Sequence, residues 1–197
     1  MTELPAPVTA LLVVDVQSAF VAGGAAVPDA PRLLDRVTDL IGRAREAGAL
    51  VVHLQNDGPV GEPDEPGTPG WVLHLPVRTG PAETVIRKSE DDGFEKTSLE
   101  AELSAAGVRA LAVCGVMSEM CVLATARRAL ELDYRVVLPH DAHATYDIPA
   151  APDISDVVPA AMASRVAAWA LGDEVEIVAH ATTVSFATAT TTTTRTA

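Results

Sequence analysis

The chain has 197 residues, and its 27 acidic and 14 basic side chains give a formal net charge of -13 at pH 7. This balance argues against a nucleic-acid-binding surface, which needs a basic face. Although 48% of the residues are apolar, no apolar run approaches the ~20 residues of a membrane span, and residues 1–10 lack the pattern of a signal peptide. We expect a single domain over residues 1–186 that makes no contact with a membrane.

Strands and helices alternate along the chain. The aliphatic run at 10–15 is typical of a strand buried on both faces, and the apolar spacing at 31–47 predicts a helix that ends at Gly48. Further strands are predicted at 50–54, 84–86, 110–114, 135–138 and 175–178. Further helices are predicted at 97–107, 121–130 and 156–171. This alternation predicts an α/β fold in which helices cover both faces of a parallel sheet.

Two helix starts carry local signals. Thr97 and Glu100 have the spacing of a capping box. Pro159 fits the first turn of the helix at 156–171, where a missing amide proton costs little. We therefore expect both helices to begin near these residues.

Two segments have no helical or strand pattern. Residues 56–81 are rich in proline, glycine and acidic residues, and a loop of this length in a compact domain is usually functional or disordered. Trp71 within it favours an ordered loop that folds over part of the domain. Residues 187–197 are a threonine-rich tail with little to bury, and we expect that tail to be disordered.

Cys121 is a candidate nucleophile. It follows the predicted strand at 110–114 and stands where a helical pattern begins. A helix N-terminus lowers the pKa of a thiol and favours the reactive thiolate. The alternative is that Cys121 is a small buried apolar residue, as free cysteines often are. Cys114, the other cysteine, lies within the strand, so no disulfide framework is predicted and a reducing, cytoplasmic location fits.

Asp15 and Lys88 also follow predicted strands, and ligands bind beyond the carboxyl ends of strands in open parallel sheets. Asp15 would exchange a proton with the thiol and Lys88 would stabilise its charge. An aspartate there can also be only a turn residue. If the strand order is 3-2-1-4-5-6, the third strand lies roughly 10 Å from the first, so residues 88–94 must bend back over the sheet edge.

Four segments together resemble the isochorismatase-like cysteine hydrolases. They are VVDVQSAF at 13–20, HLQND at 53–57, residues 88–94, and CGVMSEMCVLATARRALELDYRVVLPHDA at 114–142. The resemblance extends over about residues 10–186. It implies one Rossmann-like, three-layer domain with a six-stranded parallel sheet in the order 3-2-1-4-5-6.

The resemblance also implies the residues of the site. The catalytic triad would be Asp15, Lys88 and Cys121, and a cis peptide bond at Val116-Met117 would let the amides of Met117 and Cys121 form an oxyanion hole. The residues expected around the substrate are Gln17, Phe20, Trp71, Phe94, Met117, Glu119 and Tyr146.

Neither a metal nor a cofactor is expected. Nicotinamidases of this family carry an Asp-x-His metal motif after the second strand, whereas this chain has the sequence His53-Leu-Gln-Asn-Asp57 there. Asp141 and His143 have similar spacing but follow the fifth strand, and we expect them to pack or line a pocket rather than bind a metal.

The thiol favours cleavage of a C-N bond, because true isochorismatases, which cleave a vinyl ether, generally lack the cysteine. We expect hydrolysis of a small amide or lactam through a thioester. Residues 66–74 and 140–147 resemble the streptothricin hydrolase type, which opens the lactam of a cationic antibiotic. The alternatives are ether cleavage with Asp15 as the acid, and a non-catalytic binding protein on this fold. The resemblance also implies a homodimer or homotetramer, to which the helix at 156–171 would contribute.

Overall fold

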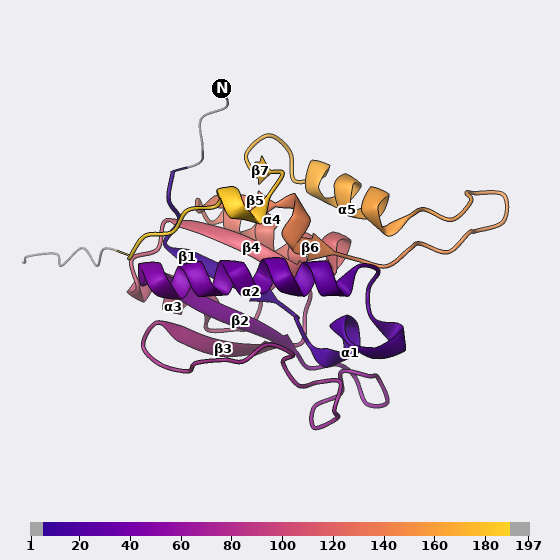
Figure 1. Cartoon of the computed structure of the whole chain (residues 1–197), viewed down its shortest axis with the longest axis horizontal. Helices are drawn as coiled ribbons and strands as arrows, with labels where there is room; N and C mark the ends of the chain where they lie inside the picture. Colours follow the sequence, from indigo (N-terminus) through magenta and orange to yellow (C-terminus); the bar gives the residue numbers. More distant parts are fainter. Residues whose placement is uncertain (1–5, 190–197) are drawn as a thin grey trace, which may run out of the picture.

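The computed structural model describes residues 6–189 and has a parallel β-sheet at its centre (Figure 1). The strands are β1 (Ala10–Val14), β2 (Leu50–Asn56), β3 (Glu83–Lys88), β4 (Ala110–Val116), β5 (Arg135–Pro139), β6 (His143–Ala144) and β7 (Glu176–Val178). The helices are α1 (Ser18–Val21), α2 (Ala30–Ala47), α3 (Leu99–Ala105), α4 (Leu123–Glu131) and α5 (Ala160–Trp169).

The strand order is β3-β2-β1-β4-β5-β7. The predicted α/β class and order are therefore confirmed, and β7 is the strand predicted as the sixth. The short strand β6 was not predicted; it pairs with the end of β4, where His143 lies opposite Gly115. Two residues are too few to produce a periodic pattern in the sequence.

The two faces of the sheet carry different helices. Leu11 and Val13 of β1 pack in a cluster with the apolar side of α2, including Val37. Leu12 and Val14, which point the opposite way, pack in a second cluster with residues of α3 and α4. Strand side chains alternate between faces, so a strand that is apolar at every position must be covered twice. Figure 1 shows α2 lying along one face.

Two predicted helix starts are wrong. The helix α3 begins at Leu99 with Ser98 as its cap, so Glu100 lies too early to close a capping box; the Ser98 hydroxyl instead donates to Glu102 Oε1 at 2.8 Å. Pro159 precedes α5 in an extended conformation (φ -59°, ψ 142°) rather than lying in its first turn. In both cases the local pattern predicted a helix of the right type but placed its first residue too early.

The long loop between β2 and β3 is ordered at the carboxyl edge of the sheet, as predicted. The side-chain amide of Gln17 donates to the carbonyls of Asn56 (3.0 Å) and Trp71 (2.9 Å). Gln55 Nε2 also donates to the Trp71 carbonyl at 2.9 Å, and Asn56 Nδ2 donates to the buried Asp64 at 2.7 Å. Backbone groups in the middle of the loop are therefore satisfied by side chains of the sheet edge.

The predicted tail lies mostly outside the described residues. Of its residues, 187–189 are described, and there the Ala187 amide donates to the Val8 carbonyl at 2.9 Å while the Thr188 hydroxyl donates to the Ala47 carbonyl at 2.8 Å. In the described part of the chain, no helix is both long enough and apolar enough to cross a bilayer.

Candidate active site

Three ionisable side chains meet at the carboxyl edge of the sheet. Asp15 follows β1, Lys88 ends β3, and Cys121 lies in the turn after β4. Their exposed fractions are 1%, 3% and 6%. Lys88 Nζ lies 2.8 Å from Asp15 Oδ2 and 3.3 Å from Cys121 Sγ. The structure thus brings together the three residues that the sequence indicated separately.

Lys88 reaches Asp15 across the end of the intervening strand. Lys88 lies opposite Asn56 of β2, and its Nζ donates to Asn56 Oδ1 at 3.3 Å. The next residues bend back over the edge, as predicted, and the Gly93 amide donates to Thr125 Oγ1 of α4 at 3.0 Å. A Cβ atom at Gly93 would lie 2.5 Å from the nearest carbon of the Leu54 side chain, so a larger residue would push this segment outward.

The end of β4 brings the backbone toward Cys121. Gly115 has a φ of 121°, and a Cβ atom there would lie 2.0 Å from the Val14 carbonyl oxygen, so only glycine fits between the two strands. The Val116-Met117 peptide bond is cis. Within residues 6–189 the Met117 amide has no hydrogen-bond acceptor, which leaves it available to a ligand.

An irregular turn over Ser118–Val122 follows the cis bond and carries Cys121. Two buried contacts hold the first residue of this turn: Ser118 Oγ lies 2.7 Å from His143 Nδ1 and 2.9 Å from Ser164 Oγ of α5. The exposed Glu119 accepts a hydrogen bond from Thr145 at 2.8 Å. Side chains of β6, α5 and the segment after β6 therefore fix the backbone next to the thiol.

Burial and the charges of the neighbouring groups together determine the protonation of the three groups. Loss of water raises the pKa of Asp15, and the attraction of Lys88 does not fully offset this. Burial acts to lower the pKa of Lys88, but the neighbouring Asp15 and Cys121 outweigh it and raise that pKa. The ammonium group is therefore retained, and Asp15 is a stronger base than an exposed aspartate.

The expectation of a lowered thiol pKa is wrong. Burial raises the pKa of Cys121, the charge of Asp15 raises it further, and Lys88 opposes them only in part. Cys121 lies in an irregular turn and is 6% exposed, rather than at the open end of a regular helix. Free Cys121 is therefore a thiol, and it would need an acceptor for its proton to become the reactive thiolate.

A hydrogen-bond acceptor is available for that proton. Asp15 Oδ2 is paired with Lys88, while Asp15 Oδ1 is buried and has no hydrogen-bond partner among residues 6–189. An unpaired buried oxygen costs free energy, typically about 1–3 kcal/mol, and such groups concentrate where a proton or ligand is exchanged.

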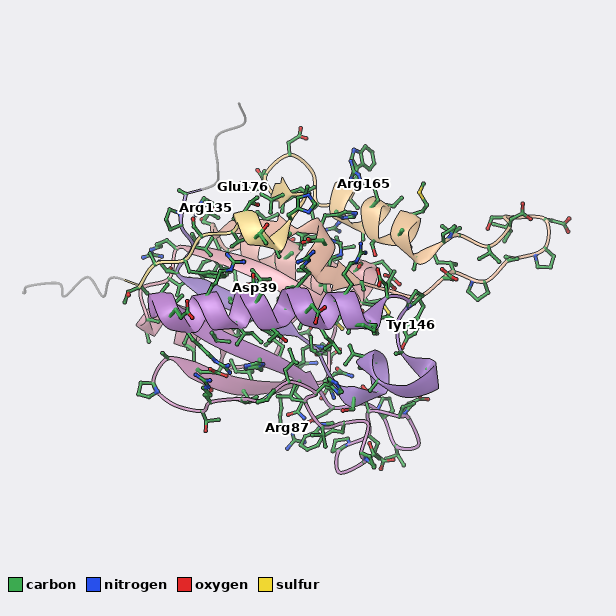
Figure 2. All side chains as sticks on the ribbon, in the orientation of Figure 1. Asp39, Arg87, Arg135, Tyr146, Arg165 and Glu176 are labelled. Atoms are coloured by element: carbon green, nitrogen blue, oxygen red, sulfur yellow. The ribbon has the colours of Figure 1, made fainter. Side chains whose placement is uncertain are left out.

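The side chains predicted to surround the substrate fall into separate groups. Phe20, Met117 and Tyr146 pack against the cluster on the α2 face, and the Tyr146 hydroxyl donates to the Ala25 carbonyl at 2.8 Å (Figure 2). Phe94 is buried in the opposite cluster and stacks with Tyr134 at 6.2 Å between ring centres. These two groups therefore lie on opposite faces of the sheet.

Trp71 lies apart from both groups and is only half-buried. Its Nε1 donates to Asp57 Oδ1 at 2.9 Å, and the Arg87 guanidinium lies 5.1 Å from its ring centre. Figure 2 shows Arg87 on the side of the long loop. Gln17, which the resemblance also places near the substrate, is fully buried and bonded to that loop.

The described residues contain no group of three or more His, Cys, Asp or Glu side chains placed to hold a metal ion. Asp141 accepts the Ala181 amide at 2.6 Å and pairs with Arg36 at 3.2 Å. Burial lowers the pKa of His143 to about 3, and its ring contacts Ser118.

Two residues at the site were missed in the sequence. Asn56 could have been found, because it ends a strand at the same edge as Asp15 and Lys88. Asp91, whose Oδ1 accepts a hydrogen bond from Cys121 Sγ at 3.5 Å, could not, because it lies in an acidic run where nothing local distinguishes one carboxylate from the next.

Comparison with known proteins agrees with this geometry. Residues 9–170 match the model of the isochorismatase domain. The chain belongs to the isochorismatase family. A solved isochorismatase from Pseudomonas putida KT2440 has a TM-score of 0.82 and 29% identity, with 92% of this chain and 93% of that chain covered.

Two relatives have more similar sequences, and both are streptothricin hydrolases of Streptomyces noursei. One is 73% identical over 179 residues, which are 91% of this chain and 65% of that protein. The other is 70% identical over 183 residues, which are 93% of this chain and 73% of that protein. The chain thus spans slightly less than two thirds of the length of the first relative.

Proposed function

We propose that this isochorismatase-family chain is a cysteine hydrolase that cleaves an amide or lactam C-N bond through a thioester, with Asp15, Lys88 and Cys121 as its catalytic residues. The observation that carries the proposal is a buried ammonium group within 2.8 Å of a carboxylate and 3.3 Å of a thiol. Structural cores rarely bury three ionisable groups in mutual contact, whereas nucleophilic catalysis requires them.

In the first step Sγ of Cys121 attacks the carbonyl carbon while Asp15 Oδ1 accepts the thiol proton. The carbonyl oxygen gains negative charge, which the amides of Met117 and Cys121 stabilise. Lys88 keeps its proton throughout. Its positive charge compensates the negative charge as that charge moves from Asp15 to the sulfur and then to the carbonyl oxygen of the substrate. The raised pKa of Asp15 suits this exchange, because a carboxylate of ordinary pKa takes a thiol proton less readily.

The C-N bond then breaks. Asp15 returns its proton to the leaving nitrogen, and the acyl group remains on Cys121 as a thioester. Asp15, now a carboxylate, accepts a proton from water as that water attacks the thioester, and the thiol leaves with this proton. The net change is the addition of one water molecule across the C-N bond.

The proposed substrate is the lactam of a streptothricin-type antibiotic. Support comes from the two similar relatives that bear that name. The test is incubation of purified protein with streptothricin, followed by mass spectrometry of the small molecule and of the intact protein. We expect the antibiotic to gain one water and a transient acyl adduct to form on Cys121. If Cys121→Ala keeps full turnover and no adduct forms, the thioester mechanism is refuted in favour of acid catalysis by Asp15.

We also propose a homodimer or homotetramer that works in the cytoplasm. On one side of α5 Met162, Val166 and Trp169 are 57%, 59% and 71% exposed, at the spacing of neighbouring helical turns. Both cysteines are unpaired, which suits a reducing compartment. Sedimentation equilibrium of the wild type and of Trp169→Glu tests the assembly. We expect the wild type to be oligomeric and the variant to dissociate. A monomeric wild type would refute the proposed oligomer.

A further inference from the structure

A second carboxylate touches the thiol, and the mechanism above does not use it. Cys121 Sγ donates to Asp91 Oδ1 at 3.5 Å, while Lys88 Nζ donates to the same sulfur at 3.3 Å. Asp91 is exposed, whereas Asp15 is 1% exposed. The reactive sulfur therefore lies between a buried carboxylate and a carboxylate in contact with solvent.

These two carboxylates are suited to different roles. Asp15 is held by Lys88 and its burial raises its pKa, so it is the stronger base for the thiol proton. Asp91 forms no ion pair with any residue in the described range 6–189. A carboxylate that has no cationic partner among these residues and lies beside the nucleophile is available to a cationic group of the substrate.

Asp91 also lines a pocket of about 320 Å³ beside the turn that carries Cys121. Glu119 and Met120, which immediately precede the thiol, form part of the same wall. The two arginines of the pocket bond to groups other than Asp91: Arg128 pairs with Glu131, which also lines the pocket, at 3.1 Å, and Arg127 donates to the Ala170 carbonyl at 3.1 Å. The end of the pocket next to the thiol therefore presents negative charge.

We propose that Asp91 is a specificity residue that binds a cationic nitrogen of the substrate next to the bond that is cleaved. A carbonyl carbon under attack lies about 3–3.5 Å from the attacking sulfur. The distance between Cys121 Sγ and Asp91 Oδ1 is 3.5 Å, so the attacked carbon and this carboxylate oxygen are at most about 7 Å apart. The preferred substrates are amides or lactams that carry an ammonium or guanidinium group within a few bonds of the carbonyl.

Binding of the cation also prepares the nucleophile. When Asp91 pairs with the substrate, it loses its hydrogen bond from Cys121, and Asp15 Oδ1 is left as the acceptor for the thiol proton. A neutral amide leaves the thiol bonded to Asp91. The selectivity therefore affects the rate of attack as well as binding. This inference rests on the proposed hydrolase function. The preference of Cys121 for a cationic over a neutral reagent can nevertheless be measured without any substrate turnover.

The first experiment measures modification of Cys121 by two methanethiosulfonates, the cationic aminoethyl reagent and the neutral methyl reagent. Each transfers its thioalkyl group to the thiolate to form a disulfide and releases methanesulfinate. Rates come from mass spectrometry of the Cys121 peptide in the wild type, Asp91→Asn and Glu131→Gln. Asp91→Asn keeps the size of the side chain, and Glu131→Gln removes an equal charge from the far end of the same pocket.

We expect the ratio of cationic to neutral rates to fall about tenfold in Asp91→Asn and less than twofold in Glu131→Gln. An unchanged ratio in Asp91→Asn, or an equal fall in Glu131→Gln, overturns the proposal, since the preference would then be absent or would come from general surface charge. Thermal unfolding of each variant confirms that the fold is retained.

The second experiment measures hydrolysis of streptothricin by the wild type, Asp91→Asn and Glu131→Gln. We expect kcat/KM to fall at least tenfold in Asp91→Asn and less than about threefold in Glu131→Gln. Equal losses in the two variants overturn the assignment. If the wild type does not hydrolyse streptothricin while its reagent ratio still depends on Asp91, the proposed function fails and the cation site stands.

Discussion

The two cysteines lie seven positions apart, and both are almost completely buried. Cys114 lies in β4 with its sulfur 3.5 Å from the Leu12 carbonyl. Burial raises its pKa, as it does that of Cys121. What separates them is their neighbours: Cys114 is surrounded by apolar side chains of the α2 face, whereas Cys121 contacts the ammonium group of Lys88.

A low resting pKa therefore does not distinguish Cys121 from Cys114. Both thiols are protonated in the free protein, and only Cys121 has a base and a compensating cation within reach of its sulfur. Cys121 also lies at the carboxyl edge of the sheet, whereas Cys114 lies inside the sheet. Three predictions test whether this difference decides reactivity.

The largest effect is expected from removing each sulfur in turn. Cys121→Ala should lower kcat for the hydrolysed amide by at least about a thousandfold, because no other side chain can form the acyl intermediate. Cys114→Ala should change kcat by less than about threefold and only lower the free energy of unfolding. Steady-state kinetics and urea unfolding of both variants measure this. Similar losses of kcat in both would mean that packing, and not the chemistry of Cys121, explains the defect.

The second prediction removes the cation that distinguishes the two sites. Lys88→Met leaves the charge of Asp15 buried without a partner, so the free energy of unfolding at pH 7 should fall by about 3–5 kcal/mol. Adding Asp15→Asn should restore most of this loss but no activity. Urea unfolding of the single and double variants measures the recovery. A double variant as unstable as Lys88→Met would show that the lysine stabilises the edge by packing alone.

The smallest expected effect is on the pH dependence of kcat/KM, whose acid limb should lie above the pKa of an exposed aspartate. In the proposed mechanism activity requires ionised Asp15, so kcat/KM should fall as the pH is lowered through its folded pKa, which burial raises above the ordinary ~3.9. Because the folded pKa exceeds the unfolded one, the Asp15 contribution to stability is full below the unfolded pKa and is lost as pH rises through the folded value. An acid limb at or below pH 3.9 would contradict the burial argument.

The fold should survive this acid range, because a second buried carboxylate behaves in the opposite way. Burial acts to raise the pKa of Glu83, but hydrogen bonds from Arg45, the Arg78 amide and His53 outweigh it and lower the pKa to about 2. Its stabilising contribution is present above the unfolded pKa of ~4.3 and is lost as pH falls through about 2. Circular dichroism along the activity profile separates loss of Asp15 ionisation from unfolding.

Much of the fold could be predicted because its signals are local. The aliphatic runs of β1 and β4, the apolar spacing of α2 and the glycine at its end each follow from contacts within a few residues. The first residues of α3 and α5 were less predictable. Several neighbouring residues could act as the cap, and the path of the preceding chain decides which of them does. The short strand β6 depends wholly on its partner and left no pattern.

Some features of the candidate site could likewise be predicted from local sequence, and others could not. Residue types and spacing were enough to place Asp15, Lys88 and Cys121 after strands, and parallel strands bring such residues to one edge. The folded chain was needed to show that Lys88 spans β2 to reach both partners and that burial keeps Cys121 protonated. It was also needed to show that Asp91, rather than another residue of its acidic run, contacts the sulfur. The physical reason is that desolvation and ion pairing depend on everything that surrounds a group, which residue type and spacing along the chain do not specify.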